Sequence, residues 1–494
     1  MAVTGVAAGK LTPAPSKQTL ATAYIDFANA GSNSANWAQQ YLPDLMEKEA
    51  EVFGNRTISG FLSQVGAEEA MAADQVIWSE QGRLHLSYKA VAGSNVSGEL
   101  RLTMTDATDV DGNAIGNGGL DHGIRPGDMV LVSDANKTVQ AYVQTVATSG
   151  TATIDCERYD GDANGLTDLD ATGLVVLVYG SEYVKGSIGR AGANKPEHLS
   201  RKNKPIILKD KYEVSGSDAS AIGWVEISGE EGQSGYLWYL KASGDTKARF
   251  SDYLEMAMCE SVTAATGMAN STVTGATGAI GGTEGLWEAL EDRGNITNFF
   301  DGTSTAALAL DEFDAMIAEL DKNGSIEENM LFVDRGAALQ IDDMLAGQNK
   351  YGTGGTSFGV FNNSEDMALN LGFSGFRRGS YDFYKTDFKY LNDAATRGLI
   401  NSKDVANAIH GVMIPAGVSS VYDQSLGKNL KRPFLHVRFR ASNLESRKYK
   451  TWTTGSVGAT TSDLDAMEMH FLSERCLVVQ GANNFFLLKG TDAS

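Results

Sequence analysis

The sequence has few of the features that mark secreted, membrane or metal-binding proteins. Its three cysteines, Cys156, Cys259 and Cys476, lie far apart and have none of the CxxC or Cys/His spacings of a structural zinc site. The most apolar stretch, Leu174 to Tyr179, is too short to cross a bilayer. The first residues, MAVTGVAAGKLTPAPSK, lack the basic start and apolar run of a signal peptide. We therefore expect reduced thiols and no membrane partner.

Basic residues and prolines are also scarce. The chain has 41 Lys and Arg against 62 Asp and Glu, a net charge of −21. Because Lys and Arg supply most of the affinity for phosphates, this balance argues against a sequence-specific nucleic-acid reader. An acidic wall that encloses DNA without binding it remains compatible. With 8 Pro, 55 Gly and 42% hydrophobic residues in 494, the chain is a folded protein with many tight turns and more than one structural unit.

Motifs of enzymes are incomplete. Residues 355–359 match GxSxG, but no strand precedes the serine and no helix follows it, as a nucleophile elbow requires. No glycine-rich loop ends in the GK[ST] of a phosphate cradle. The six histidines are scattered. His436 and His470 lie on predicted strand faces opposite the apolar residues, where we expect a solvated or hydrogen-bonded histidine and not a metal ligand or base. We predict that the protein is not an enzyme.

Hydrophobic periodicity predicts an α+β fold. Residues 1–40 have the composition of an extended arm, and residues 41–64 have helical spacing. Two strands are expected in 75–88. Residues 92–185 contain short β-rich runs separated by Gly, Asp and Asn, which predicts an inserted β-barrel or sandwich domain. Residues 204–227 are expected to be extended.

The second half alternates helices and strands. The longest predicted helix is Thr246 to Thr266, stopped by Gly267, and a second helix covers residues 306–320. A strand at 330–333 precedes a helix that we expect Asp334 to cap. From residue 380 to the end, alternating apolar residues predict mainly strands.

One segment has the composition of a calcium loop. Asp160, Asp162, Asn164 and Asp168 place oxygen donors at nearly alternating positions, and Gly165 supplies a sharp turn. The twelfth position, which should hold a bidentate Glu, is Ala171, with Asp170 beside it. The alternative is a plain β-turn, which Asp, Asn and Gly favour through their backbone preferences. Calcium is the only cofactor that the sequence suggests.

The order of segments resembles a known family. The residues that support this are LPDLMEKEAEVFGNRTISGFL, DQVIWSEQGRLHLSY, KPIILKDKYEVSG before the long helix, ENMLFVDRGAALQIDDML, and ERCLVVQGANNFFLLK at the end. Together they resemble the Hong Kong 97-like major capsid proteins of tailed bacteriophages. The resemblance implies an N-terminal arm, an extended loop with limbs at 75–91 and 186–228, a peripheral domain with a spine helix, and an axial domain.

The resemblance and the periodicity together predict seven segments, in which the β domain is a departure from the minimal family pattern. The segments are an arm (1–40), the start of the peripheral domain and first limb of the loop (41–91), the inserted β domain (92–185), the returning limb (186–235), the spine helix (236–284), the axial domain (285–430) and the C-terminal return strands (431–494).

The resemblance also implies a function. It predicts self-assembly into homopentamers and homohexamers of an icosahedral head that encloses double-stranded DNA, with the protein located in the virion after assembly in the host cytoplasm. Portal, a separate scaffold protein and decoration proteins are expected partners. The alternative is another self-assembling structural protein, such as a tail or surface-layer component with an adhesive role. Repeats or an export signal would favour that alternative, and we find neither in the sequence.

Overall fold

The structure is a computed structural model of the whole chain. It describes residues 60–490 except 63–66, 82–84, 110–111, 113, 116–120, 163, 191, 193–197, 218–225, 229–233, 265–269, 272–277, 298–305, 325, 350–374, 402–407, 417, 424–427 and 458–460. The predicted arm, most of the predicted helical segment 41–64 and the GxSxG match at 355–359 therefore lie outside the described residues. Within the described part, no helix is long and apolar enough to span a bilayer.

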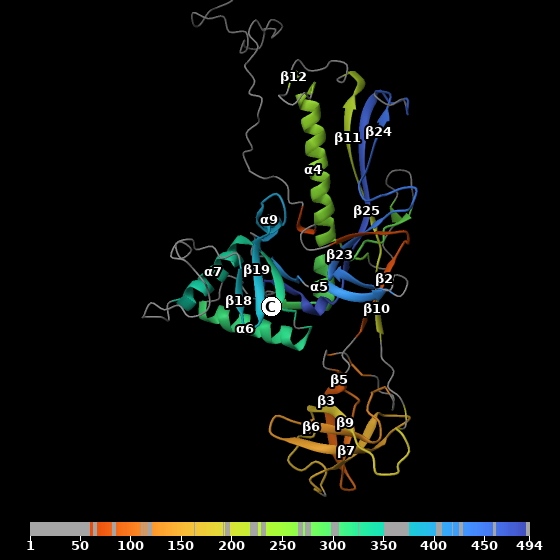
Figure 1. Cartoon of the computed structure of the whole chain (residues 1–494), viewed down its shortest axis with the longest axis vertical. Coiled ribbons are helices and arrows are strands. Elements are labelled where there is room, and N and C mark those ends of the chain that lie inside the picture. Colours follow the sequence, from red (N-terminus) through yellow and green to blue (C-terminus); the bar gives the residue numbers. More distant parts are fainter. Residues whose placement is uncertain are drawn as a thin grey trace, which may run out of the picture. The chain divides into compact units, whose positions relative to one another are not determined.

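A long helix, α4 (Leu237–Glu260), lies along a five-stranded sheet (Figure 1). Phe250 and Leu254, one helical turn apart, are buried against Phe471 of the sheet. The strands are β1 (Ala67–Met71), β23 (Leu435–Arg440), β25 (Ala466–Val479), β11 (Ile206–Ser215) and, beside the first half of β25, β24 (Lys450–Gly455). β1 is parallel to β23, and the other pairs are antiparallel.

The bounds of α4 differ from the predicted helix 246–266. The helix begins nine residues earlier and ends at Glu260, well before Gly267. Its end coincides with contacts from a distant segment, because the Thr263 backbone N–H donates to the Glu288 carboxylate at 2.9 and 3.1 Å. Gly285 lies so close to the Ser261 carbonyl that a Cβ there would meet it at 2.5 Å. Tertiary contacts, not local propensity, end the helix.

A second mixed sheet has six strands in the order β16-β26-β20-β17-β19-β18, and α6 and α7 pack on it. Phe313 of α6 and Ile341 of α7 share a core with Phe383 of β19. The predicted helix 306–320, the strand at 330–333 and the Asp334 cap are confirmed, since Asp334 Oδ1 accepts the Ala337 N–H at 2.7 Å. The elements are β16 (Asn295–Thr297), α6 (Ala306–Lys322), β17 (Glu328–Val333), α7 (Arg335–Asn349), β18 (Gly375–Arg378), β19 (Tyr381–Asp387), β20 (Ile409–Pro415) and β26 (Phe486–Lys489).

Seven strands between Ser87 and Ser181 form a separate sheet with its own core. The order is β4-β8-β7-β6-β9-β3-β5, and β3 also pairs with β4, so six strands close into an antiparallel barrel. The strands are β3 (Ser87–Val96), β4 (Glu99–Thr103), β5 (Thr108–Asp109), β6 (Asp128–Ser133), β7 (Thr138–Val146), β8 (Thr153–Arg158) and β9 (Leu174–Ser181). The first strand begins five residues before the predicted start at 92.

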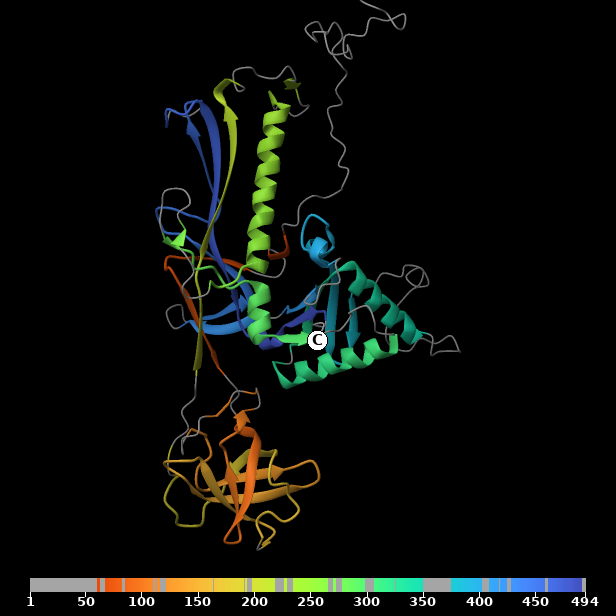
Figure 2. The same cartoon turned by 180° about the vertical axis from the view of Figure 1, so that it is seen from behind.

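One strand of a two-stranded ribbon precedes the barrel in the sequence, and the other strand follows it. Strand β2 (Val76–Gln81) pairs antiparallel with β10 (His198–Asn203), and all seven barrel strands lie between them in the chain (Figure 2). Residues 206–215, which lie in the predicted returning limb and were expected to be extended, form strand β11 and pair with β25. The reason is their period-two pattern, in which Ile206, Leu208, Tyr212 and Val214 are more buried than the residues between them.

The remaining elements are short. They are β12 (Glu226–Ser228) with β13 (Ser234–Tyr236), β14 (Asn270–Ser271) with β15 (Gly278–Ala279), β21 (Val418–Asp423) with β22 (Lys428–Pro433), the helices α5 (Leu286–Arg293), α9 (Lys389–Asn392) and α10 (Gly398–Asn401), and the 3₁₀ turn η2 (Ala482–Asn484). One core cluster contains Met258 of α4, Leu290 of α5, Phe332 of β17 and Leu477 of β25, so it joins the two large sheets.

Candidate assembly elements

Asn203 anchors the β2–β10 ribbon to the body of the protein. Its buried amide nitrogen donates to the carbonyls of Leu477 at 2.7 Å and Glu284 at 2.9 Å. Its oxygen accepts from the Thr283 hydroxyl at 3.0 Å and from the backbone N–H groups of Glu284 at 3.0 Å and Lys204 at 2.8 Å. One side chain therefore fixes the end of β10 to both α5's leading segment and β25.

Residues 60–62 are held against α4 and the core beside it. Phe61 is 4% exposed and packs between Phe332 and Phe388, with ring centroids 4.7 and 4.5 Å away. The backbone N–H groups of Gly60 and Phe61 both donate to the Glu255 carboxylate of α4, the second at 3.3 Å. Burial raises the pKa of Glu255 to about 7. Residues 60–62 are thus fixed in the core of the described chain.

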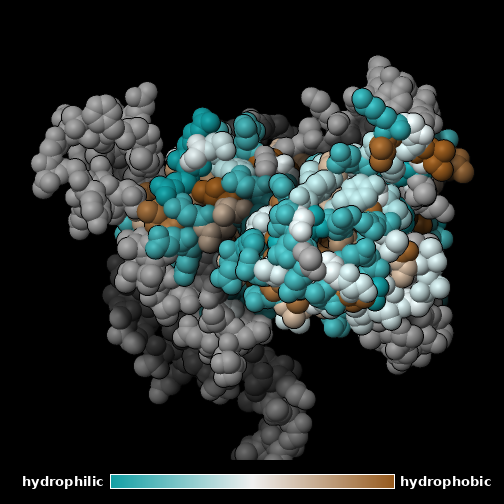
Figure 3. Space-filling model, turned by 90° about the horizontal axis from the view of Figure 1, so that it is seen from below, coloured by the Kyte–Doolittle hydropathy of each residue, from teal (hydrophilic) through white to brown (hydrophobic). Residues whose placement is uncertain are grey.

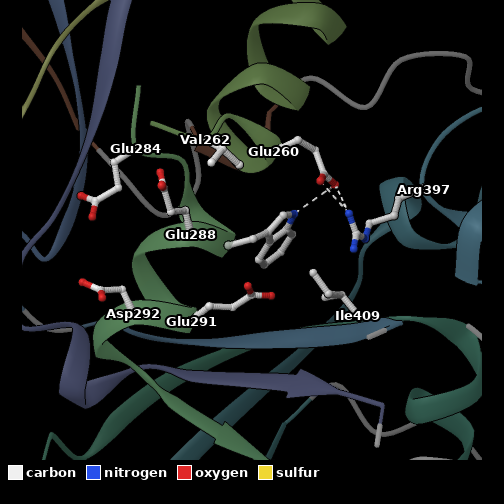
Figure 4. Close-up of a pocket in the computed structure, with 9 residues that line it drawn as sticks. Glu260, Val262, Glu284, Glu288, Glu291, Asp292, Arg397 and Ile409 are labelled. Carbon is white, nitrogen blue, oxygen red and sulfur yellow. Dashed lines mark hydrogen bonds and ion pairs between the residues drawn. The ribbon is translucent and has the colours of Figure 1, made fainter. Parts of the chain in front are cut away.

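Glu260 at the end of α4 forms a second junction. Its carboxylate accepts from Arg397 at 2.6 Å, from the Tyr390 hydroxyl at 2.6 Å and from the Trp287 indole N–H at 3.1 Å. Figure 4 shows the Glu260 carboxylate in direct contact with Arg397, and both residues line a cavity. The partners come from α5, α9 and the turn before α10, so this carboxylate ties the end of the long helix to three other elements.

The cavity at this junction has a volume of ≈ 640 Å³ and is rich in carboxylates. Besides Glu260 it is lined by Glu284, Glu288, Glu291 and Asp292. Each of these already has a partner in the chain: Arg293 for Glu284 and Asp292, Thr263 for Glu288, and Lys489 for Glu291 at 3.2 Å. The arrangement stabilises the junction of α4 and α5.

The cysteines and histidines fit a structural role. Burial raises the pKa of Cys156 and Cys259, and that of Cys476 to about 12, so all three thiols stay protonated. His436, expected to be either solvated or hydrogen-bonded, is only 1% exposed, and its Nδ1 lies 3.3 Å from the Pro433 carbonyl, which fits the hydrogen-bonded alternative. Both faces of β23 are covered at this position. Among the described residues, no group of three His, Cys, Asp or Glu could hold a metal ion.

The residues of the predicted calcium loop surround a side chain of the protein itself. Arg158, whose side chain is 1% exposed, donates to Asp160 at 2.5 and 3.0 Å and to the Thr167 carbonyl at 2.8 Å. Asp162 lies 3.9 Å from the same guanidinium. Two further members lie elsewhere, because Asp168 pairs with Lys137 at 2.5 Å and Asn164 accepts from Asn95 at 2.5 Å. Calcium at this loop stays a prediction.

Sequence reasoning missed the junction residues. Glu260 and Arg397 are 137 positions apart, and Asn203 sits in the polar run RKNKP, which has the composition of an exposed turn. Only Phe61 and Leu62 carried a usable signal, as an apolar pair directly after a glycine. The face drawn in Figure 3 is mainly hydrophilic, and its hydrophobic residues form small separate groups.

No family model and no curated protein matches the sequence. Among solved structures, 117 chains match. The capsid of a native GTA particle matches with a TM-score of 0.36 and 11% identity over 93% of this chain and 99% of that chain. A chain of Microbacterium phage Oxtober96 has a TM-score of 0.35 and 9% identity over 92% and 96% of the two chains.

The capsid of cyanophage P-SCSP1u has a TM-score of 0.34 and 10% identity over 64% of this chain and 81% of that chain. The GTA and cyanophage matches are capsid structures.

Proposed function

We propose that this chain is a major capsid protein of a tailed phage, which assembles with its own copies into pentamers and hexamers of an icosahedral head around double-stranded DNA. The observation that carries the proposal is the β2–β10 ribbon. A two-stranded ribbon outside a larger sheet is marginally stable in water. This ribbon is fixed at one end by Asn203, and next to that end Ile77, the register partner of Lys202, is 66% exposed. A neighbouring copy would supply the missing packing.

In this proposal the described elements take the roles of the family pattern. α4 and the five-stranded sheet are the peripheral domain, and the six-stranded sheet with α6 and α7 is the axial domain. The β2–β10 ribbon is the paired part of the extended loop, and the barrel is a domain inserted in that loop. Residues 1–40 are an arm that a neighbouring copy orders. The proposed segments keep the limits predicted from the sequence, except that the barrel begins at Ser87 and not at residue 92.

The net charge of −21 favours a shell that encloses DNA over a protein that binds specific DNA sequences, because acidic surfaces repel phosphates. Portal, a separate scaffold protein and decoration proteins are the partners that such a shell requires, with assembly in the host cytoplasm and a final location in the virion. The partnered carboxylates of the α4–α5 cavity and the protonated thiols support a structural role over a catalytic one.

Assembly of the purified protein tests the proposal. Light scattering and negative-stain electron microscopy of the full chain should detect capsomers or closed shells. Ile77→Glu should block assembly and leave the melting temperature nearly unchanged, because the side chain is mostly exposed in the single chain. Ile77→Val, which keeps an apolar side chain, should assemble. A monodisperse monomer or small closed oligomer under all conditions would contradict the proposal, and open sheets or fibres would favour a surface-layer or tail component.

A further inference from the structure

The outer surface of the barrel has an unusual composition over strands β6 to β9. In these strands Val130, Val132, Ala141, Ile154 and Cys156 point into the core. The alternate residues, which point outward, include several apolar and aromatic side chains: Met129, Leu131, Tyr142, Val175 and Leu177. Outward positions of an antiparallel sheet are normally polar when water covers them. We call this surface the outer barrel face.

The strand registers make the face continuous. Glu157 of β8 is opposite Tyr142 of β7, Tyr142 is opposite Met129 of β6, and Met129 is opposite Gly180 of β9. One row along, Leu131 is opposite both Gln140 of β7 and Leu177 of β9. The apolar centre therefore spans neighbouring strands and is not a set of isolated residues.

Tyrosines border the apolar centre. Tyr159 follows β8 and is 48% exposed, and Tyr179 of β9 is 47% exposed. The Tyr159 hydroxyl donates to Glu182 at 2.7 Å, which holds its ring in place. Tyrosine and methionine are enriched in the centres of protein–protein interfaces, where a rigid ring is buried at little cost in conformational entropy. This composition fits a protein partner better than open solvent.

Two acidic residues, Glu157 and Glu182, lie at the edge of the outer barrel face. Neither Glu157 nor Glu182 forms an ion pair with any described residue; their partners are Gln144 and Tyr159. The surrounding barrel is acidic as well, because residues 87–181 contain thirteen Asp and Glu against five Lys and Arg. A partner for this face should therefore carry positive charge around apolar side chains.

The chain itself has a surface of that chemistry. Residues 185–209 contain seven Lys and Arg and a single Glu, although the whole chain carries −21. Within them, Lys202, Lys204 and Lys209 are exposed and form no ion pair with the described residues. Ile207 beside them is 51% exposed, and Ile77 on the paired strand is 66% exposed. Asn203, between the lysines, is buried and fixes the backbone of this cationic strip.

We infer that the outer barrel face of one copy binds the cationic strip, Lys202 to Lys209, of a neighbouring copy. The inference rests on the proposed function and adds to it which two surfaces meet. The two surfaces are different, so the contact is heterologous, and a heterologous contact repeated around an axis closes a ring such as a pentamer or hexamer. Tyrosine rings next to lysine ammonium groups add a cation–π attraction to the ion pairs.

Charge reversal tests the contact in the full chain. Glu157→Lys with Glu182→Lys should reduce the yield of particles at least roughly tenfold, because like charges brought together at an interface oppose association. Lys202→Glu with Lys204→Glu should have the same effect. A chain with all four substitutions restores opposite charges and should assemble again. The control Asp106→Lys changes an exposed residue in the turn between β4 and β5 and should assemble normally.

Melting curves confirm that each variant is folded before its assembly is scored. The inference is overturned if either pair of substitutions leaves assembly intact, or if both pairs block it and the fourfold variant does not recover. Unlabelled and ¹⁵N-labelled wild-type chains can be mixed, assembled into particles and treated with a carbodiimide. Cross-links between Glu157 or Glu182 and the cationic strip should then join a light peptide to a heavy one. Cross-links only within one chain would also overturn it. Failure of wild-type protein to assemble would instead count against the proposed function.

Discussion

The side-chain amide of Asn203 donates to the backbone carbonyl of Leu477 at 2.7 Å, across 274 positions of sequence. The same nitrogen donates to Glu284, and the oxygen of the amide accepts three further hydrogen bonds. A buried group with this many partners is costly to change, because each lost partner leaves a polar atom unsatisfied away from water. The relationship links the start of the ribbon to the core of the protein.

Asn203→Asp is therefore expected to lower the free energy of unfolding by about 2–4 kcal/mol, since a carboxylate would point an acceptor at two carbonyl oxygens. Denaturant unfolding at neutral pH measures this. Asn295→Asp is the matched control, because the Asn295 amide is exposed and donates one bond, to the Asn483 carbonyl at 2.6 Å. Equal losses for the two variants would show that Asn203 is not a special anchor.

Glu255 predicts a pH dependence of stability. Burial raises its pKa to about 7 from an ordinary value of 4.5, so the folded protein holds the proton more tightly than the unfolded chain does. The contribution of this group is complete below pH 4.5 and is lost as the pH rises through 7. Relative to Glu255→Gln, the wild type should lose about 2 kcal/mol of unfolding free energy between pH 4.5 and pH 8.

Glu445 is the control for this pH dependence, because its pKa is shifted in the opposite direction to that of Glu255. Lys450 holds the pKa of Glu445 below its ordinary value, so the Glu445 contribution is present above pH 4.5 and is lost as the pH falls. Glu445 is on the surface, and Glu445→Gln should change the pH profile only slightly and in that direction. A pH-independent difference between the wild type and Glu255→Gln would exclude the raised pKa.

The sequence predicted the elements better than their partners. Residues 306–320 and the Asp334 cap follow from helical periodicity and capping chemistry, which act within a few residues. The end of α4 at Glu260 depends on Glu288 and Gly285, and the pairing of 206–215 depends on β25. Such contacts between distant segments leave no mark in a single sequence, so the predicted bounds of the long helix were wrong and the pairing of 206–215 was not predicted.

The candidate calcium loop shows the same limit. Asp160, Asp162, Asn164 and Asp168 have donor-rich spacing, but the sequence does not say whether a metal or a side chain balances their charge. Arg158 lies two residues before the loop, and its burial at 1% exposure becomes visible only in the folded barrel. The outer barrel face was missed for a related reason, because period two shows that a strand alternates but not what covers its second face.

Arg158→Met should destabilise the barrel by about 1–3 kcal/mol, because it leaves the Thr167 carbonyl without its donor, while Asp160, which is 46% exposed, can be hydrated. Arg101→Met is the control, since Arg101 also pairs with a carboxylate, Asp155, but is 36% exposed and should cost less than about 1 kcal/mol. Thermal unfolding with and without EDTA shows whether calcium or the Arg158 guanidinium balances the charge of the loop. A lower melting temperature of the wild-type barrel in EDTA supports calcium, and equal curves support Arg158 as the cation of the loop.

Deletion of residues 1–40 should leave the fold intact and weaken assembly. The first anchored residues of the described chain are Gly60 and Phe61, which stay in place in the shortened protein. Circular dichroism and melting curves should match the full chain, while the yield of particles falls. Loss of the folded state on deletion would mean that the segment belongs to the core and is not an arm.

The final prediction is that the barrel can be removed without unfolding the rest of the protein. Gln81 and His198 are register partners at the end of the ribbon, so a short Gly/Ser turn can join them in place of residues 82–197. A cut at residue 92 would divide β3, which is why the excision must begin earlier than the predicted domain. The shortened chain should keep a cooperative melting transition, because its two large sheets and their shared core contain no barrel residue. A control that removes only residues 120–185 should aggregate, since it leaves β3, β4 and β5 with unpaired edges. An unfolded chain after the full excision would contradict the independence of the barrel.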